Sequence, residues 1–175
     1  HSSKYMQSKL QGEKNIENMF KPSVILRPSV VFGPEDKFFN TFASLAQFFP
    51  FLPLIGGGKT KFSPIYCGDV AKAIVKSLEL NNSKCKIFEL GGPSNYSFKE
   101  LMEILLQEIK KKRLLINIPF SLAKFQSYFL QIFQNPLITP DQVEMLKYNN
   151  IVSGNYPTLN DLGISGTPIQ NVLPK

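Results

Sequence analysis

The stretch that decides the fold spans residues 24–39 and reads VILRPSVVFGPEDKFF. It begins as an apolar, β-branched run, which is typical of a buried strand. The run breaks at Arg27-Pro28 and again at Gly33-Pro34, and such positions end regular structure. We therefore predict a strand over residues 24–26 that leads through a loop into a helix. Because ligands of open α/β sheets bind where strands end, one wall of any site should lie near residues 27–34.

Outward from this stretch, helical periodicity alternates with short β-branched runs. The expected helices span residues 3–20, 36–48, 69–80, 97–109, 121–133 and 139–147, and the expected strands or extended pieces span 24–26, 61–66, 86–90 and 114–118. We interpret residues 49–54, FPFLPL, as a proline-broken loop. In the helix over residues 69–80, the side chains expected to face inward are Val70, Ala73, Ile74 and Leu78. This alternation predicts the α/β class.

The composition is that of an ordinary folded chain. With 43% hydrophobic and 19% charged residues, the 175 residues are enough for one domain or most of one. The net charge of +7 would suit an acidic partner such as nucleic acid, anionic lipid or a phosphorylated ligand. The lysines are scattered, however, and the dense cluster at residues 110–113 lies at a predicted helix end, where it favours the helix dipole. We therefore expect no nucleic-acid partner.

Cysteine spacing and hydropathy argue against two further classes. Cys67 and Cys85 have no Cys or His neighbour at metal-ligand spacing, so we predict free, buried thiols and no metal site. The weakly charged window over residues 114–133 contains Pro119 and Lys124 and is a poor membrane span, so we expect no integral membrane segment. We interpret this window either as the core of one lobe or as a docking surface for a partner subunit or a membrane.

Tyr5 and Lys9 are the first candidate pair for chemistry. A spacing of four residues on a helix places both side chains on one face. An ammonium beside a phenol favours the phenolate, and lowering a phenol pKa by about 3 units requires about 4 kcal/mol of differential stabilisation. Such a pair could pass a proton to or from a hydroxyl during hydride transfer. The same spacing is common on helix surfaces, so taken alone it leaves both interpretations open.

Longer motifs narrow the choice. Residues 3–13 (SKYMQSKLQGE), 25–28 (ILRP) and 31–34 (VFGP) together resemble the second half of an extended or atypical short-chain dehydrogenase/reductase. In that superfamily a Tyr-x-x-x-Lys helix precedes a strand that ends in Arg-Pro, followed by a Tyr/Phe-Gly-Pro turn. The order and the distances of the motifs agree here.

Further motifs resemble one family within this superfamily, that of the Rossmann-fold accessory subunit of respiratory complex I. Its bacterial relatives are described as NAD-dependent epimerase/dehydratase-like. The motifs occupy residues 33–40, 52–62, 68–71, 89–93, 137–146 and 162–164. Phe62 stands where nucleotide-sugar epimerases carry a phosphate-binding arginine, which argues against a nucleotide-sugar substrate.

The resemblance implies an α/β fold: the C-terminal part of a Rossmann-like doubly wound parallel sheet plus a smaller substrate-side lobe, with the N-terminal βαβ units absent. Residues 1–34 and 67–92 would form the C-terminal part of the NAD(P)-binding Rossmann domain, and residues 35–66 and 93–175 the substrate-side lobe. The family's phosphate-binding Gly-x-x-Gly-x-x-Gly turn does not occur in these 175 residues. We therefore expect the binding of NAD or NADP to need the missing N-terminal half.

The resemblance also implies roles for individual residues. Tyr5 and Lys9 would be the catalytic residues and would contact the nicotinamide ribose. The backbone around Pro28, Ser29 and Val31 would lie against the nicotinamide ring.

Two functions then remain open for the complete protein. One is an NAD(P)-dependent oxidoreductase or epimerase with Tyr5 as its acid/base. The other is a non-catalytic NAD(P)H-binding accessory or assembly factor of NADH-ubiquinone oxidoreductase. A chain without independent function is the third alternative. The expected partners are complex I subunits and a small-molecule substrate. The expected location is the bacterial cytoplasm or the mitochondrial matrix side, peripheral to the inner membrane.

Overall fold

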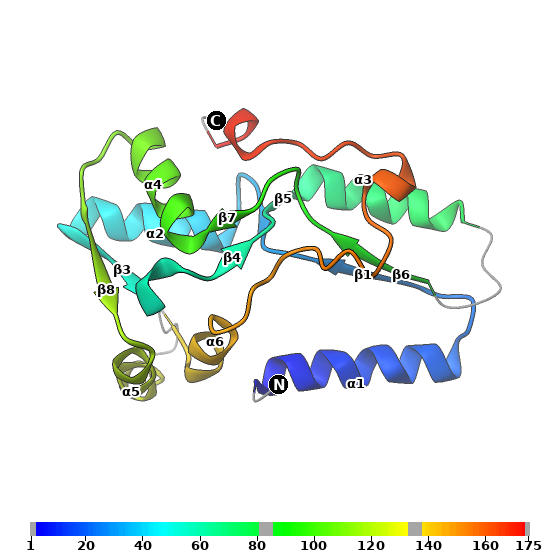
Figure 1. Cartoon of the computed structure of the whole chain (residues 1–175), viewed down its shortest axis with the longest axis horizontal. Helices are drawn as coiled ribbons and strands as arrows, with labels where there is room; N and C mark the ends of the chain where they lie inside the picture. Colours follow the sequence, from blue (N-terminus) through cyan, green and yellow to red (C-terminus); the bar gives the residue numbers. More distant parts are fainter. Residues whose placement is uncertain (1–2, 81–85, 133–137, 174–175) are drawn as a thin grey trace.

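The structure, a computed structural model, describes residues 3–80, 86–132 and 138–173 (Figure 1). Its α-helices are α1 (Lys4–Met19), α2 (Lys37–Phe48), α3 (Cys67–Leu78), α4 (Phe98–Glu108), α5 (Phe120–Leu130) and α6 (Pro140–Met145). Its strands are β1 (Val24–Pro28), β2 (Val31–Phe32), β3 (Phe51–Ile55), β4 (Lys61–Phe62), β5 (Ile65–Tyr66), β6 (Lys86–Leu90), β7 (Tyr96–Ser97) and β8 (Leu114–Ile118). Short 3₁₀ turns are η1 (Gly56–Gly58), η2 (Asn160–Leu162) and η3 (Ile169–Asn171).

The predicted strand at residue 24 is confirmed, and it continues to Pro28 as β1. It pairs in parallel with β6, in a register that aligns Val24 with Lys86 and Pro28 with Leu90. Helix α3 lies on one side of this pair and α1 on the other (Figure 1). The β2–β5 and β3–β8 pairs are also parallel, and β4–β7 is antiparallel. The chain therefore has the predicted α/β class with parallel strand pairing.

A first core cluster covers the β1–β6 pair. Its buried side chains are Ile65, Ala73, Phe88, Leu90, Leu159, Leu162 and Ile164. The tail of the chain thus returns to the strand pair near the N-terminus, and the amide of Glu89 in β6 donates to the carbonyl of Pro157. The division of the chain into two lobes remains a prediction. Residues 159–164, which fall in the predicted substrate-side lobe, pack against β6 and α3.

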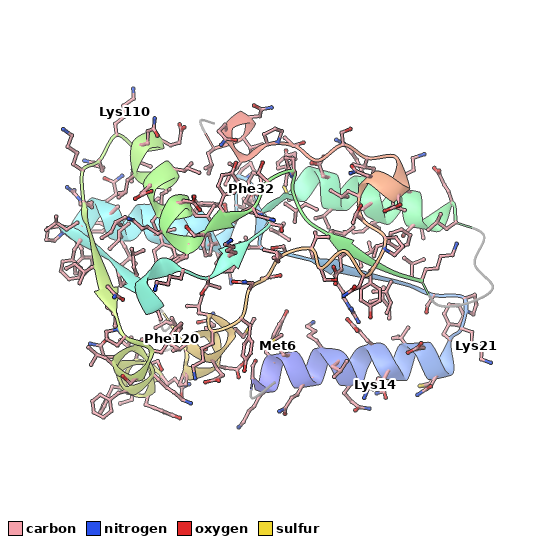
Figure 2. The ribbon with its side chains drawn as sticks, in the orientation of Figure 1. Met6, Lys14, Lys21, Phe32, Lys110 and Phe120 are labelled. Carbon is pink, nitrogen blue, oxygen red and sulfur yellow. The ribbon has the colours of Figure 1, made fainter. Side chains whose placement is uncertain are left out.

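A larger core cluster is rich in phenylalanine. Phe38 lies beside Phe39, Phe42 and Phe98, with ring centroids 5.1, 5.5 and 5.9 Å apart. Phe32 is fully buried in the same cluster (Figure 2). Edge-on aromatic packing of this kind stabilises a core beyond the area that it buries. The second half of the opening stretch is therefore anchored by aromatic rings.

The segment over residues 49–54 differs from the prediction. It was expected to be a loop, but residues 51–55 form β3 in parallel register with β8, with Pro53 opposite Ile116. Proline lacks an N–H and is tolerated in a strand that has a partner on one edge. Among the described residues, β3 pairs with β8 alone. The proline therefore does not end the strand.

Helix α3 and Cys67 also depart from the predictions. The helix begins at Cys67, whose thiol is free and exposed rather than buried. Ala73 faces the core as expected, whereas Ile74 and Leu78 are 50% and 82% exposed. The apolar face of α3 is wider than the surface that the described chain covers. The second cysteine, Cys85, lies outside the described residues.

The apolar window over residues 114–133 is only partly core. Ala123 and Ser127 of α5 are buried, while Phe125, Phe129 and Ile132 are exposed. Residue 133 lies outside the described residues. Within the described parts of the chain, none of the helices combines the length and the apolar character needed to cross a membrane.

Candidate functional site

Tyr5 and Lys9 lie together near the start of α1. Ser3 is the N-cap of this helix, and its Oγ accepts a hydrogen bond from the amide of Met6. One helical turn separates the two candidate residues, and the Lys9 Nζ lies 5.4 Å from the centroid of the Tyr5 ring. Both side chains are exposed. The shared face predicted from the spacing is present, and the catalytic role remains a prediction.

The ammonium of Lys9 is available to a ligand. Among the described residues it forms no ion pair with a carboxylate. An ammonium that lies over a phenol ring and has no carboxylate partner can still hydrogen-bond to vicinal hydroxyls such as those of a ribose. The pair therefore fits the ribose contact that the family resemblance implies.

The N-terminus of α1 is held by Asp141 from the first turn of α6. The Oδ1 of Asp141 accepts from the amide of Lys4 at 2.8 Å, and its Oδ2 accepts from the amide of Tyr5 at 3.1 Å and from Ser3 Oγ at 2.9 Å. Partial burial opposes the charge, but these hydrogen bonds outweigh it and lower the pKa of Asp141. Asp141 therefore acts as a charged cap on the helix that carries Tyr5.

A second contact ties α1 to β1. Arg27 donates to Glu13 through Nε at 2.9 Å and through Nη2 at 2.6 Å. Its guanidinium carbon also lies 4.8 Å from the centroid of the Tyr156 ring. The hydrogen bonds to Glu13 raise the pKa of Arg27 against the opposing effect of burial. The Arg27 guanidinium therefore remains charged at neutral pH, and its bonds to Glu13 fix the middle of α1 beside β1.

In the segment predicted to lie against the nicotinamide, residues 28–31, the side chain of Ser29 joins distant parts of the chain. Pro28 is exposed, Val31 is partly buried, and Ser29 is buried. Ser29 Oγ donates to the carbonyl of Asn150 at 2.6 Å and accepts from the amide of Ser63 at 3.1 Å. The Ser29 hydroxyl is thus committed to joining three chain segments. The prediction for Pro28, Ser29 and Val31 concerned their backbone, and it remains a prediction.

Asp69 holds the chain after β5 to the C-terminal tail. Its carboxylate is fully buried, and it accepts from Lys72 Nζ at 3.0 Å and from the amide of Thr167 at 2.6 Å. Burial alone would raise the pKa of Asp69, but the hydrogen bonds from Lys72 and Thr167 lower it overall. These two hydrogen bonds therefore explain why the fold can bury a charged carboxylate at this position.

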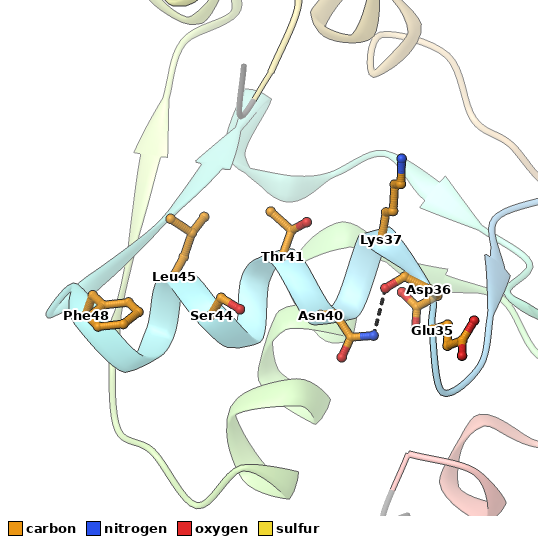
Figure 3. Close-up of a pocket in the computed structure, with 8 residues that line it drawn as sticks. All are labelled: Glu35, Asp36, Lys37, Asn40, Thr41, Ser44, Leu45 and Phe48. Atoms are coloured by element: carbon orange, nitrogen blue, oxygen red, sulfur yellow. Dashed lines mark hydrogen bonds between the residues drawn. The ribbon is translucent and has the colours of Figure 1, made fainter. Parts of the chain in front are cut away.

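A shallow depression lies elsewhere, along the outer face of α2 (Figure 3). Its lining residues are Glu35, Asp36, Lys37, Asn40, Thr41, Ser44, Leu45 and Phe48. Asn40 Nδ2 donates to the carbonyl of Asp36 at 2.8 Å at one end of it. The predicted site residues do not line this depression. Within the described ranges, three or more His, Cys, Asp or Glu side chains do not gather in a way that could hold a metal ion.

Asp141 is the residue that sequence reasoning missed. Thr139-Pro140 predicted a helix start, and the capping box of Thr139 with Gln142 is present. That local signal explains an acidic side chain in the first turn of α6. Its actual partners lie more than 130 residues earlier in the chain, so local spacing could not reveal them.

Comparisons with known sequences agree with the resemblance. The chain is 34% identical over 172 residues to NADH dehydrogenase (ubiquinone) 1 alpha subcomplex subunit 9, mitochondrial, of Arabidopsis thaliana, covering 93% of this chain and 43% of that protein. It is 33% identical to the Mus musculus protein of the same name, covering 97% of this chain and 45% of that protein. The chain thus spans slightly less than half the length of these curated relatives. No protein-family model matches it.

Solved structures share the fold. The ADP-L-glycero-D-manno-heptose-6-epimerase of Helicobacter pylori superposes with a TM-score of 0.62 at 19% identity, covering 97% of this chain and 50% of that one. A double mutant of DesIV, the dTDP-glucose 4,6-dehydratase of Streptomyces venezuelae, was solved with NAD and DAU bound. It superposes with a TM-score of 0.64 at 16% identity and covers 95% of this chain and 46% of that one. By sequence, the chain is therefore similar to the complex I alpha subcomplex subunit 9 proteins over slightly less than half of their length, and it shares the α/β fold of these epimerase and dehydratase structures.

Proposed function

We propose that this chain supplies the nicotinamide side of an NAD(P) site in a complex I-associated protein of the short-chain dehydrogenase/reductase type. The carrying observation is the Tyr5–Lys9 pair, which is exposed on α1 with the Lys9 ammonium 5.4 Å from the Tyr5 ring centroid. The DesIV neighbour was solved with NAD, which supports a dinucleotide as the ligand. Pro28, Ser29 and Val31 would present backbone to the nicotinamide.

In this proposal the pyrophosphate is bound by a glycine-rich turn that another part of the protein contributes. Residues 1–34 and 67–92 would form the C-terminal part of the dinucleotide-binding domain, and residues 35–66 and 93–175 would form the substrate-side lobe. The exposed apolar faces of α1 and α3 support this view, because a further α/β unit beside β1 would cover them. The mitochondrial complex I relatives support a partner among complex I subunits and a mitochondrial location, which would be the matrix side of the inner membrane in this proposal.

The test is a titration of the native protein, including its dinucleotide-binding half, with NADH and NADPH by fluorescence. Lys9→Met should weaken the preferred dinucleotide by about tenfold, since it removes a charge-assisted hydrogen bond to the ribose. Lys14→Met removes a lysine elsewhere on the same helix (Figure 2) and should leave the affinity unchanged. Equal affinities for both variants and the wild type would refute the proposed site.

Turnover separates the two functional classes. If the protein is an oxidoreductase or epimerase, Tyr5→Phe should abolish a single turnover of bound cofactor while the cofactor still binds. If the cofactor is structural, bound NADPH should persist without oxidation in wild type and variant alike. Either result leaves the binding proposal intact, and absence of binding by the wild-type protein would refute it.

A further inference from the structure

Helix α1 is weakly anchored by apolar contacts. None of the residues in the helix is buried, and Leu10, Ile16 and Met19 are all exposed. In most proteins a helix is held chiefly by its buried apolar face. Among the described residues, polar contacts therefore help to fix the position of α1, and they include the Glu13–Arg27 ion pair and the cap from Asp141.

These two contacts control different parts of the helix. Glu13 lies eight residues after Tyr5, which is about 12 Å along the helix axis. The ion pair with Arg27 therefore restrains the middle of α1, about two turns away from Tyr5. Asp141 bonds the amide of Tyr5 itself, so it sets the position of the Tyr5 backbone directly.

Asp141 is itself well fixed. The reciprocal bonds between Thr139 and Gln142 close the N-terminus of α6, and Val143 on the next turn is fully buried. Lys124 of α5 and Lys147 both pair with Glu144 on the same short helix. Any displacement of α6 is therefore transmitted through a carboxylate to the first turn of α1.

We propose that Asp141 is a positioning residue, which holds the Tyr5–Lys9 pair in place from the opposite lobe and makes its placement depend on α6. This inference rests on the proposed function, because the pair is the nicotinamide-side contact. In this arrangement Asp141 touches neither cofactor nor substrate and acts through the backbone of Tyr5. A ligand that moves α6 would move the Tyr5 hydroxyl with it.

The test uses the native protein labelled with ¹³Cζ-tyrosine, in which Tyr5→Phe identifies the Tyr5 resonance. Asp141→Asn keeps the size of the side chain but removes its charge and one acceptor oxygen. We expect it to shift and broaden the Tyr5 resonance, to speed amide exchange at Lys4 and Tyr5, and to weaken NADPH binding about fivefold, because the charge that strengthens these hydrogen bonds is lost. Asp141→Glu should restore part of each effect.

The matched control is Asp161→Asn. Asp161 is also a carboxylate that caps backbone, but it is exposed, and it accepts from the amide and hydroxyl of Thr158 in the tail. It should leave the Tyr5 resonance and the NADPH affinity unchanged. If Asp141→Asn behaves like this control, the inference is overturned.

The remaining outcomes also decide. A wild-type protein that binds no NADPH would refute the proposed function, whereas the Tyr5 resonance and the amide exchange would still judge the positioning role. If Asp141→Asn does not fold, Ser3→Ala removes one of the three bonds to the carboxylate together with the N-cap bond to the amide of Met6, and it should therefore also move the Tyr5 resonance. An unmoved resonance in that variant would overturn the inference.

Discussion

Arg27 is the residue that joins the strand of the opening stretch to the helix of the candidate site. Its planar guanidinium meets both oxygens of Glu13 and lies over Tyr156 at the same time. Lysine can supply the charge but neither the paired geometry nor the stacking. The Arg27 side chain is 31% exposed and that of Glu13 is 22% exposed, so water weakens the pair only in part.

Arg27→Lys should therefore lower the free energy of unfolding by about 1 kcal/mol. Urea denaturation followed by circular dichroism measures the change. Lys76→Met is the control, since its ion pair with Glu79 is more than half exposed on both sides, and it should change stability by less than about 0.5 kcal/mol. Equal effects of the two substitutions would show that the paired geometry of Arg27 contributes nothing.

The charge of Asp69 should make the free energy of unfolding depend on pH. Hydrogen bonds hold its folded pKa below the unfolded value of about 3.9, so its stabilising charge is fully present above that pH and is lost as the pH falls through the folded pKa. The difference in unfolding free energy between the wild type and Asp69→Asn should stay constant from pH 7 to about pH 5 and shrink below pH 4.

Urea denaturation at a series of pH values measures this difference. Lys72→Met should move its decline to higher pH, because the substitution removes a hydrogen bond and a charge that keep the pKa of Asp69 low. A difference that does not change with pH would contradict the role assigned to the carboxylate.

Among the elements, the end of β6 is packed too closely for a side chain. A Cβ added at Gly92 would collide with the carbonyl oxygen of Pro64, and one at Gly91 would lie 2.5 Å from Val152 Cγ2 and 2.8 Å from Ser63 Cβ. The glycines therefore allow the end of β6 to approach the connection between β4 and β5. Backbone on the opposing side leaves little room for relaxation.

Gly92→Ala should destabilise the protein by about 2 to 3 kcal/mol, the cost of overpacking against backbone. Gly12→Ala is the matched control within α1, where an added Cβ meets nothing within 4 Å. It should stabilise the protein by about 0.5 to 1 kcal/mol, because alanine loses less entropy in a helix. Thermal unfolding of both variants measures the contrast, and similar melting temperatures would contradict it.

Across the fold, two helices on opposite sides of the β1–β6 pair present uncovered apolar surface. On α3, Ile74, Val75 and Leu78 are all at least half exposed, and α1 buries none of its residues. Among the described residues, β1 pairs with β6 alone, so its other edge is open. An open parallel edge flanked by helices with exposed apolar side chains is suited to a further α/β unit.

The 175-residue chain produced alone should therefore bind the dye ANS and self-associate. Substituting Val75 and Leu78 together by lysine should reduce both, because it removes the exposed apolar face of α3 without touching its buried side. Dye fluorescence and analytical ultracentrifugation measure the two effects. If the chain is a monomer that binds no dye, the exposed apolar side chains of α1 and α3 do not require a further unit to cover them.

Secondary structure could be predicted from the sequence, because it depends mainly on residues within one helical turn or one strand. The four-residue spacing brought Tyr5 and Lys9 to one face, and the helix predicted over residues 97–109 is present, with Ser97 as its N-cap and a capping box with Glu100 closing its N-terminus. The β-branched runs predicted β1, β6 and β8. The prediction of a loop at β3 was wrong, because whether Pro53 interrupts a strand depends on which edge of that strand has a hydrogen-bonded partner.

Tertiary structure decided the contacts between distant segments. The chain path alone brings Asp141 to the amides of Lys4 and Tyr5, and Asn150 to Ser29. It also decides that Ile74 and Leu78 face outward, since an apolar stripe does not say which neighbour covers it. The physical reason is range: periodicity and caps depend on nearby residues, whereas burial and long-range capping depend on how the whole chain is packed.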